Sequence, residues 1–405
     1  MLVPTIRFPD FTGEYEERPL SDFLSENKEK NRQNLYTKED VKSVSGDFGV
    51  VNQIEFFGKS MAGADVSNYH VVHHNNVVYT KSPLKANPYG IIKCNTGTDG
   101  IVSTLYAVYY CNDDVVPEYV DYYFGYDKRV NKYLLPLVNI GAKHDMKVNN
   151  QDAISGSVYF PSIDEQKKVV EALNAYDERV RNQLSVIEAL ETRRKGLLQQ
   201  IFSQEIRFKA DDGSEFPDWE DTMLSDILTE RKLKSTGNEE VYSVSVAKGL
   251  VNQIEHLGRS FAAEDTSKYK VVKPGDVVYT KSPTGDFKWG IVKQSMIDKD
   301  VIVSPLYGIF IPKSYAFGFV LDAYFSSSVR AHNYLITQIR KGAKNTINIT
   351  NDVFLEKEIF LPTSEEEARK IQAFVELLDK QIQIEKDKLE AIKQVKKGLL
   401  QQMFV

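Results

Sequence analysis

The stretch that decides the fold is VNQIEFFGKSMAGADVSNYHVVHHNNVVYTKSPLKANPYG, from Val51 to Gly90, because it returns later in the chain. The stretch VNQIEHLGRSFAAEDTSKYKVVKPGDVVYTKSPTGDFKWG, from Val251 to Gly290, aligns with it without a gap at an offset of 200, and 21 of the 40 positions are identical. Solenoid repeats are far shorter, roughly 20–50 residues. The chain is therefore predicted to hold two copies of one domain plan.

Short segments outside these 40 residues also occur in both copies. They are IRF at 6–8 and 206–208, LSDFL at 20–24 and LSDIL at 224–228, GAK at 141–143 and 342–344, and the octets KGLLQQIF at 195–202 and KGLLQQMF at 397–404. If the segments that end in the octets are antiparallel helices, the octets hold equivalent places in a molecule with an internal pseudo-twofold repeat.

Each copy shows two patterns in turn. The first, over about 150 residues, has short β-branched and aromatic runs separated by Gly, Pro, Asn and Asp, which is typical of strands and turns. The second begins at Ser162–Glu165 and at Thr363–Glu366, which both fit the capping box of a helix start. Roughly 40 residues without proline follow, so each copy is predicted to end in a long helix.

The predicted helices carry a narrow apolar stripe at steps of three and four residues, which is typical of a coiled coil. Two long helices of matched length favour pairing with each other; the alternative is an amphipathic helix packed on its own domain. Arg194 and Lys396 hold equivalent positions near the stripe and are expected to need solvent or a carboxylate. The stripe residues are Val169, Leu173, Tyr176, Val180, Leu184, Ile187, Leu190, Leu197 and Ile201, then Ile371, Val375, Leu378, Ile382, Leu389, Ile392, Leu399 and Met403.

The predicted fold class is α+β, with two β-rich domains joined by two long helices that form an antiparallel coiled coil. The predicted divisions are a first β-rich domain at 1–160, a first helix at 161–203, a linker and second β-rich domain at 204–361, and a second helix at 362–405.

Composition limits the class of protein. The 405 residues include 42% apolar residues, enough for real cores, and carry a net charge of −6, which argues against a general polyanion binder but not against local basic faces. No apolar run has the length of a membrane span, and the first residues do not fit a signal peptide. Cys94 and Cys111 do not make a disulfide framework, so a cytoplasmic location is expected.

The order and duplication of these segments resemble the specificity subunits of type I restriction-modification enzymes. The residues that carry the resemblance are IRFPDF at 6–11, IRFKADDGSEFPDWED at 206–221, the Phe-Pro and Leu-Pro helix entries at 160–161 and 361–362, and the two octets. The resemblance covers essentially the whole chain. No single one of these motifs is highly specific for the family. Their order and duplication along the chain are specific.

The resemblance implies two target recognition domains, each of which reads one half of a split double-stranded DNA site, spaced by the coiled coil. It implies two methyltransferase subunits as partners, with restriction and translocase subunits added for cleavage. In many family members the two recognition domains differ strongly in sequence. Here they are close relatives, so the two half-sites are expected to be similar.

The chain is expected to have no catalytic activity, no cofactor and no metal of its own. NPYG at 87–90 lacks the second proline of an amino-methyltransferase motif, and no glycine-rich loop or Walker motif is present. HVVHH at 70–74 favours a surface strand over a metal cluster, because alternation places its histidines on both faces of the strand. Cys94 is matched by Gln294 in the second copy, which argues against a thiol–zinc site.

Basic stretches in both copies are candidate DNA contacts. Residues 330–344 hold four Lys or Arg and no acid, and residues 127–147 hold five Lys or Arg against two Asp. Lysine and arginine bind phosphates, although each stretch is also compatible with a solvated face. The candidates from these stretches are Lys128, Arg129, Lys143 and Lys147 in the first copy and Arg330, Arg340, Lys341 and Lys344 in the second.

The shared segment YTKSP, at 79–83 and 279–283, offers donors on a loop that directly follows a strand, and the loops after it diverge. Two readers of related half-sites are expected to share a framework and differ in such loops, although the loops are equally compatible with capping a core. VNQIE, identical in both copies, fits adenine recognition or plain scaffold. The loop candidates are Lys81, Ser82, Lys85, Asn87 and Tyr89, then Lys281, Ser282, Asp286, Lys288 and Trp289.

The function that this sequence favours is sequence-specific DNA binding by a non-catalytic subunit. The alternative is a structural scaffold with two β-rich binding domains spaced by a coiled coil and no DNA specificity. The salt dependence of DNA binding distinguishes the two hypotheses, because phosphate contacts make DNA affinity fall steeply as the salt concentration rises.

Overall fold

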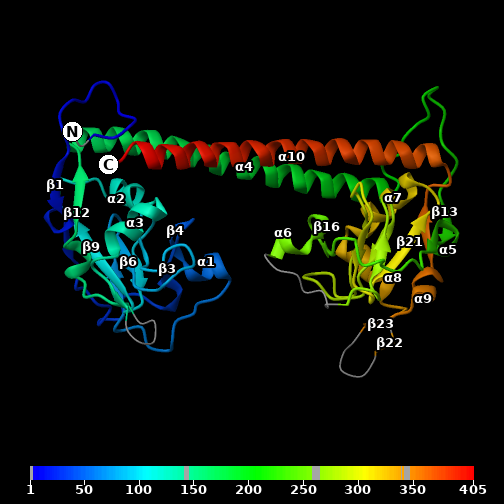
Figure 1. Ribbon diagram of the computed structural model, residues 1–405, viewed down its shortest axis with the longest axis horizontal. Helices are drawn as coiled ribbons and strands as arrows, with labels where there is room; N and C mark the ends of the chain where they lie inside the picture. The colour runs from blue at the N-terminus through cyan, green and yellow to red at the C-terminus, as the bar shows by residue number, and fades with distance from the viewer. Residues whose placement is uncertain (1–2, 141–145, 258–264, 339, 342–346) are drawn as a thin grey trace. The chain divides into compact units, whose positions relative to one another are not determined.

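The structure is a computed structural model that describes residues 3–140, 146–257, 265–338, 340–341 and 347–405. The chain divides into two compact units (Figure 1). Unit 1 comprises Met1–Val186 and Glu385–Val405, and unit 2 comprises Ile187–Ile384. Each unit therefore holds one β-rich copy together with part of each long helix.

In the part that the structure describes, unit 1 is built from short strands and three short helices besides the long ones. The strands are β1 Glu16–Pro19, β2 Leu24–Glu26, β3 Lys42–Ser45, β4 Gly49–Asn52, β5 His70–Val72, β6 Val77–Thr80, β7 Ile91–Cys94, β8 Gly100–Val102, β9 Tyr106–Cys111, β10 Asn139–Ile140, β11 Met146–Lys147 and β12 Ser157–Phe160. The helices are α1 Gln53–Phe57, α2 Pro117–Phe124 and α3 Asp127–Leu134, with 3-10 turns at Leu20–Asp22, Lys38–Asp40 and Asp152–Ile154.

Unit 2 repeats this order. Its strands are β13 Glu220–Met223, β14 Leu228–Glu230, β15 Tyr242–Ser245, β16 Gly249–Asn252, β17 Lys270–Val272, β18 Val277–Tyr279, β19 Val292–Gln294, β20 Val301–Val303, β21 Gly308–Pro312, β22 Arg340–Lys341, β23 Ile347–Asn348 and β24 Glu358–Leu361. Its short helices are α5 Leu224–Ile227, α6 Gln253–Leu257, α7 Tyr315–Phe325, α8 Ser328–Leu335 and α9 Asn351–Leu355. The two long helices are α4 Ile163–Phe202 and α10 Glu365–Gln402.

The main sheets of the two units have the same antiparallel topology. The strand order is β2-β9-β6-β7 in unit 1 and β14-β21-β18-β19 in unit 2. In unit 1, α2 and α3 lie between this sheet and the long helices (Figure 1), and all three layers share one buried core. The buried side chains include Tyr79, Tyr119, Leu134 and Leu173. The predicted fold class, with two β-rich copies and two long helices, is confirmed.

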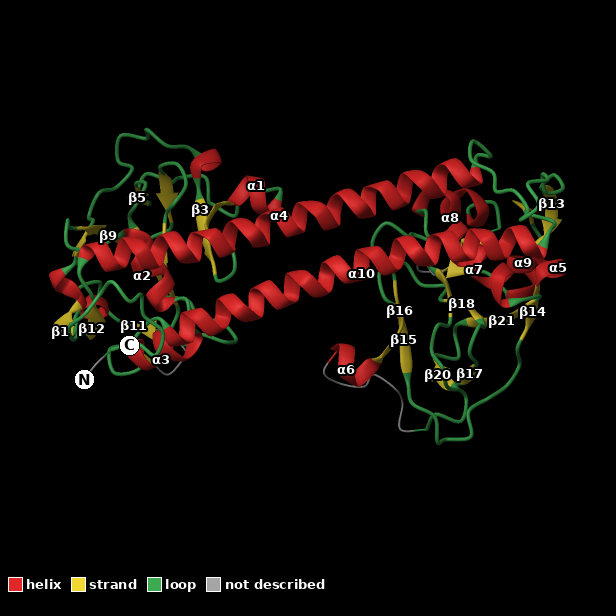
Figure 2. Cartoon of the chain, turned by 90° about the horizontal axis from the view of Figure 1, so that it is seen from above, coloured by secondary structure: helices red, strands yellow, loops and turns green. Residues whose placement is uncertain are grey.

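The two long helices pair in opposite directions within each unit. In unit 1 the first part of α4 lies beside the last part of α10 (Figure 2), and Gln183 Nε2 donates to Glu385 Oε2 at 2.7 Å. The predicted stripe supplies buried residues on both helices, among them Ile187 at 7% and Val375 at 0% exposed. Leu184 is an error of that prediction: it is 44% exposed.

Two further details of the helices differ from the prediction. In the first octet Leu198 is buried at 2% exposed while Leu197 is only partly buried, because the helix turns the second leucine toward the core of unit 2. The second helix is capped by Ser364, whose hydroxyl accepts from the Glu367 backbone N–H at 3.4 Å, and not by Thr363. Thr363 instead donates to the Asp218 carbonyl.

The cations predicted near the stripe both reach carboxylates. Lys396 pairs with Asp177 in unit 1, and Arg194 pairs with Asp379 in unit 2. Both pairs join α4 to α10 and hold equivalent positions in the repeat. A charged group near an apolar seam is tolerated when its partner lies on the facing helix.

The IRF segments attach to the long helices. The guanidinium of Arg7 forms a bidentate pair with Glu165 at 2.8 Å for both bonds, and the Tyr15 hydroxyl donates to the same carboxylate at 2.8 Å. Arg207 pairs with Glu367 in the same way in unit 2, at 3.2 Å. These motifs therefore anchor the start of each copy to a buried glutamate in the first turn of a long helix.

Over the residues that the structure describes, no helix has both the length and the apolar character that crossing a bilayer requires. Cys94 and Cys111 are both free thiols. Burial raises the pKa of each thiol.

Candidate nucleic-acid interface

In unit 1 the candidate interface begins where β6 ends at Thr80, and Lys81 is the next residue. The Lys81 ammonium donates to Asn150 Oδ1 at 2.5 Å, and Asn150 Nδ2 donates to Glu26 Oε1 at 2.5 Å. Partial burial lowers the pKa of Lys81, and the Glu26 carboxylate opposes that shift. The chain of hydrogen bonds therefore holds a positive charge at a defined place beside the strand end.

In unit 2, Glu230 and Asn351 take the places of Glu26 and Asn150, but the amide oxygen of Asn351 accepts no hydrogen bond from Lys281. Asn351 Nδ2 donates to Glu230 Oε1 at 2.5 Å, but Asn351 Oδ1 is buried and has no hydrogen-bond partner among the described residues. Burial and the charge of Lys270 lower the pKa of Lys281 to about 8. Lys281 also has a φ of +55°, in the left-handed region that a β-carbon disfavours. The second site is therefore held in a strained, partly desolvated state.

The loops after the two strands have the same backbone turn and different tips. The first and last residues of 84–87 exchange backbone hydrogen bonds of 3.0 and 3.1 Å, and those of 284–287 exchange bonds of 3.0 Å each. The tips are Lys85-Ala86 in unit 1 and Gly285-Asp286 in unit 2. The shared framework with divergent loops, expected from the sequence, thus extends to the backbone of the turn.

A buried tyrosine anchors the far end of each loop. The Tyr79 hydroxyl donates to the Tyr89 carbonyl at 2.8 Å, and the Tyr279 hydroxyl donates to the Trp289 carbonyl at 2.7 Å. Burial raises the pKa of both tyrosines, so they stay neutral donors. This anchor gives a structural role to the tyrosine of the VVYT segment in both copies.

The loop candidates differ in exposure. Lys85, Lys128 and Lys288 are exposed. Asn87 is 6% exposed and donates to Asp127 Oδ1 at 3.0 Å, which ties the loop to α3 and favours a structural role for its amide. The partly buried candidates are Lys81, Ser82, Tyr89, Lys281, Ser282 and Trp289.

The two arginine candidates of the basic stretches bind the fold itself. Arg129 donates to the carbonyls of Tyr123 at 2.8 Å and Leu400 at 3.0 Å. Arg330 donates to the Tyr324 carbonyl at 2.8 Å. Burial lowers the pKa of both arginines. Their contacts favour a structural role, and a DNA contact by either stays a prediction.

For the remaining basic candidates the structure gives no side-chain contacts. Lys143 and Lys344, in the two GAK segments, lie outside the described residues. Lys147 lies in β11, and Arg340 and Lys341 form β22. Their DNA contacts also stay predictions.

The polar side chains of VNQIE act within the scaffold in both copies. Asn52 and Asn252 each accept backbone N–H bonds from the first turn of the helix that follows, at 2.9 Å for the shorter bond. Gln53 and Gln253 each donate from Nε2 to a serine hydroxyl at 2.8 Å. The sequence left VNQIE open to adenine recognition or to a scaffold role, and these contacts favour the scaffold role.

The histidine cluster makes ion pairs within unit 1. His73 bonds Asp99 through Nδ1 at 2.7 Å and Glu29 through Nε2 at 2.8 Å, and these bonds raise its pKa. His70 lies in β5, and burial lowers its pKa. No group of three or more His, Cys, Asp or Glu side chains in the described ranges has the arrangement of a metal site.

The sequence analysis missed the carboxylate–amide pair near each lysine, whose amide binds Lys81 in unit 1. Glu26 and Asn150 in unit 1, and Glu230 and Asn351 in unit 2, occupy equivalent places around the strand end. The available signal was their recurrence at offsets of 204 and 201 residues, which lies outside the block aligned at offset 200.

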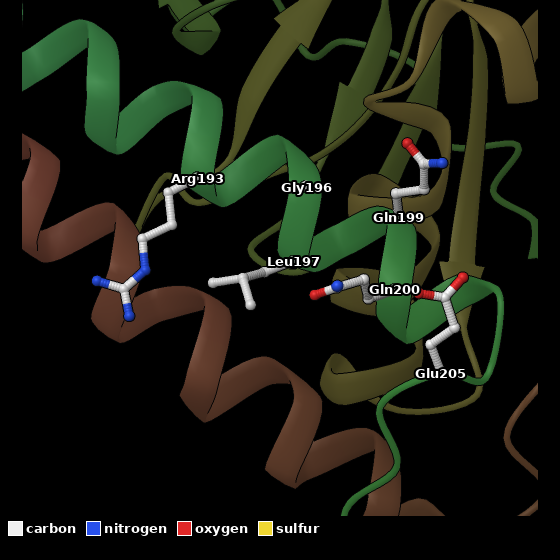
Figure 3. Close-up of a pocket in the computed structure, with 6 residues that line it drawn as sticks. All are labelled: Arg193, Gly196, Leu197, Gln199, Gln200 and Glu205. Carbon is white, nitrogen blue, oxygen red and sulfur yellow. The ribbon is translucent and has the colours of Figure 1, made fainter.

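A shallow pocket of about 390 Å³ lies at the end of α4 in unit 2. Figure 3 shows the residues that line it: Arg193, Gly196, Leu197, Gln199, Gln200 and Glu205. Both glutamines of the octet are exposed. The partly buried Leu197 adds apolar surface to this otherwise polar pocket.

Comparisons with known proteins point to one family, although no family model matches the chain. A type I restriction enzyme specificity subunit of Methanocaldococcus jannaschii, MjaVIII, is 27% identical over 262 aligned residues. The match covers 59% of this chain and 59% of that relative, so it spans about three fifths of the relative's length.

Two solved structures share the fold over nearly the whole chain. The type I restriction-modification S subunit from M. genitalium matches with a TM-score of 0.54 and 13% identity, and covers 100% of this chain and 99% of its own. A structure of the type I R-M system, described as showing complex assembly and conformational transition, matches with a TM-score of 0.54 and 16% identity, over 96% of this chain and 97% of its own. This chain is therefore similar to the specificity subunits of type I restriction-modification enzymes, in sequence over about three fifths of its length and in fold over nearly all of it.

Proposed function

We propose that this chain is a sequence-specific DNA-binding subunit that recognises a bipartite site, one half with each β-rich domain. The observation that carries the proposal is the duplicated strand end. Lys81 and Lys281 follow equivalent strands, a carboxylate–amide pair lies beside each lysine, and the two loop tips differ. A shared backbone frame with variable tips suits two readers of related half-sites, because phosphate contacts position a protein while base contacts specify the sequence.

The proposal includes partner subunits. Adenine methylation and ATP-dependent cleavage would reside in two methyltransferase subunits and in restriction subunits, while this chain supplies recognition without catalysis. Support comes from the similar proteins, of which one is a type I specificity subunit and another belongs to a type I R-M system studied for its complex assembly. The antiparallel helices would set the spacing between the half-sites.

The direct test is DNA binding by the chain together with type I methyltransferase subunits of its host. The probe is a duplex that carries the site found by mapping methylated adenines in the host genome. We expect a sequence-specific affinity whose logarithm falls linearly with the logarithm of the salt concentration. Equal affinity for the site and for a scrambled duplex would overturn the proposal.

The spacing role has its own test. Deletion of one heptad from α4 and of the facing heptad from α10 is expected to shorten the recognised spacer, because each helix residue contributes about 1.5 Å of rise. An unchanged spacer in the methylation map would show that the helices do not act as a ruler.

We further propose that the octets help to bind the methyltransferase subunits. The exposed Gln199 and Gln200 line the pocket at the end of α4. Substitution of both glutamines by alanine should weaken the complex in a pull-down or sedimentation experiment, with Lys195→Ala as a control on an exposed neighbour outside the pocket. Unchanged assembly by the double variant would count against docking at this place.

A further inference from the structure

An exposed leucine sits at the same turn in both units. Leu105, between β8 and β9, is 62% exposed, and Leu306, between β20 and β21, is 71% exposed. A single exposed leucine is ordinary on a protein surface. Two exposed leucines at equivalent positions are less ordinary, because other surface loops of the two copies differ in sequence. A shared function would explain them.

The turn that carries each leucine is closed in the same way. The Tyr106 N–H donates to the Ser103 carbonyl at 3.0 Å, and the Ser103 hydroxyl accepts from the Leu105 N–H at 3.3 Å. In unit 2 the equivalent bonds, made by Ser304, are 3.1 and 3.3 Å. Each leucine is therefore presented at a narrow tip whose backbone is held by two hydrogen bonds.

In unit 1 this tip lies at the same end of the sheet as the lysine of the candidate interface. Thr80 pairs with Tyr106, so Lys81 and Leu105 are the next residues beyond the ladder on adjacent strands. His70 is nearby, since its strand β5 pairs with β8, but burial lowers the pKa of its imidazole and favours the neutral form. Lys81 thus supplies a cation beside the apolar tip.

Unit 2 shows the same juxtaposition with more charge. Tyr279 pairs with Gly308, so continuing the register by two residues brings Lys281 opposite Leu306. The Lys270 ammonium donates to the carbonyl of Tyr307, the residue after Leu306, at 2.6 Å. The nearby Glu230 carboxylate already accepts from Asn351. Two lysines therefore lie beside the apolar tip.

Resting on the proposed DNA-recognition function, we propose that Leu105 and Leu306 are apolar wedges that enter the minor groove of their half-sites and partly unstack a base step. A leucine side chain carries no hydrogen-bonding group, so it cannot read a base edge by hydrogen bonds. A narrow apolar tip beside cations suits a groove about 6 Å wide between two phosphate backbones. Apolar side chains inserted in this way kink the duplex. The adjacent lysines hold the phosphates on either side.

The test compares Leu306→Ala with the wild-type chain, both as full-length protein with methyltransferase subunits. The probe is the duplex identified by methylation mapping, with 2-aminopurine placed at successive steps of the half-site. Wild-type binding should raise the 2-aminopurine fluorescence at one step and bend the duplex. Leu306→Ala should abolish the fluorescence signal in its half-site, reduce the bend to the part that Leu105 produces, and lower the specific affinity about tenfold, as the loss of one good base contact does.

Matched variants isolate the wedge. Leu377→Ala removes another exposed leucine of unit 2, 65% exposed on α10, and should leave binding and bending unchanged. Leu306→Met keeps apolar volume and should retain the fluorescence signal. Lys281→Ala should reduce the salt slope by about one, whereas Leu306→Ala should leave that slope unchanged.

The outcomes separate the two proposals. Absence of sequence-specific binding by the wild-type chain would overturn both. Specific wild-type binding with unchanged affinity and bending for Leu306→Ala would overturn the wedge alone. So would a loss of methyltransferase binding by this variant in the absence of DNA, or a loss of affinity when thymines are replaced by uracils, since the latter would indicate a methyl contact in the major groove.

Discussion

The guanidinium carbon of Arg330 lies 4.7 Å from the ring centroid of Phe202, the last residue of α4. The equivalent contact in unit 1 joins Arg129 to Phe404 at 5.2 Å. Both phenylalanines are the final residues of the repeated octets. The octet repeat therefore has a packing role in each unit, in which an aromatic side chain at a helix end packs against an arginine of the short helix α3 or α8.

Loss of Arg330 is expected to destabilise the fold more than it weakens DNA binding. The guanidinium donates to the Tyr324 carbonyl and packs on Phe202, and together these contacts contribute about 2 kcal/mol in comparable sites. Arg330→Ala should lower the free energy of unfolding by that amount in a urea titration, with an unchanged salt slope for DNA binding. Arg330→Lys should recover only part of the stability. A lower salt slope with unchanged stability would instead indicate a phosphate contact.

Arg7→Ala is expected to be strongly destabilising. The variant leaves the carboxylate of Glu165, whose side chain is 2% exposed, without its cation, and such a loss costs about 3 kcal/mol. Arg18→Ala is the matched control, because its pair with Asp22 is exposed at 37% and 40% and should contribute less than about 1 kcal/mol. Thermal unfolding of both variants measures the difference. Equal effects would show that burial does not set the strength of the Arg7 pair.

The ion pair between Arg194 and Asp379 should show a measurable coupling. Its second bond, from Nη2 to Oδ2, is 2.9 Å, and the side chains are 25% and 45% exposed. A double-mutant cycle with Arg194→Ala and Asp379→Ala should give a coupling energy of about 1 kcal/mol that shrinks at high salt. A coupling that persists unchanged in 1 M salt would show that the pair acts through packing of the arginine stem.

DNA affinity is expected to depend on pH through Lys281. In the free protein its pKa is lowered to about 8, and a bound phosphate would favour the charged form and raise that pKa. Binding above pH 8 therefore takes up a proton, so affinity should fall as pH rises, by up to about tenfold per pH unit. Lys281→Arg keeps its charge and should remove this dependence between pH 7.5 and 9, in roughly the range where the lysine titrates. A pH profile shared by the variant would exclude Lys281 as the titrating contact.

Much of the architecture was predictable because it depends on repeats and apolar spacing, which can be read from one sequence alone. The offset of 200 residues between identical segments predicted two copies, and the stripe through Val169 and Ile371 predicted paired helices. Arg194 and Lys396 were expected to reach solvent or a carboxylate, because a charge beside an apolar seam has few other partners, and both reach carboxylates. All these inferences use local spacing and a comparison of the chain with itself.

The candidate site was less predictable, because exposure and pairing depend on residues that meet only after folding. Lys81 was a candidate from its place after a strand, but Asn150 and Glu26, which hold it, lie 69 and 55 positions away in the sequence. Arg129 and Arg330 were candidates as members of basic stretches. The structure places both against aromatic rings and backbone carbonyls, contacts that no linear charge count reveals.

The sequence by itself determined the duplication, the α+β class, the two long helices and their likeness to specificity subunits, since periodicity and repeated motifs are properties of the chain. Only the tertiary structure decided which of the shared residues face solvent. It assigned Asn52 and Gln53 to the scaffold and presented Leu105 and Leu306 at exposed tips, because the strand register sets which side chains lie together at the end of a sheet.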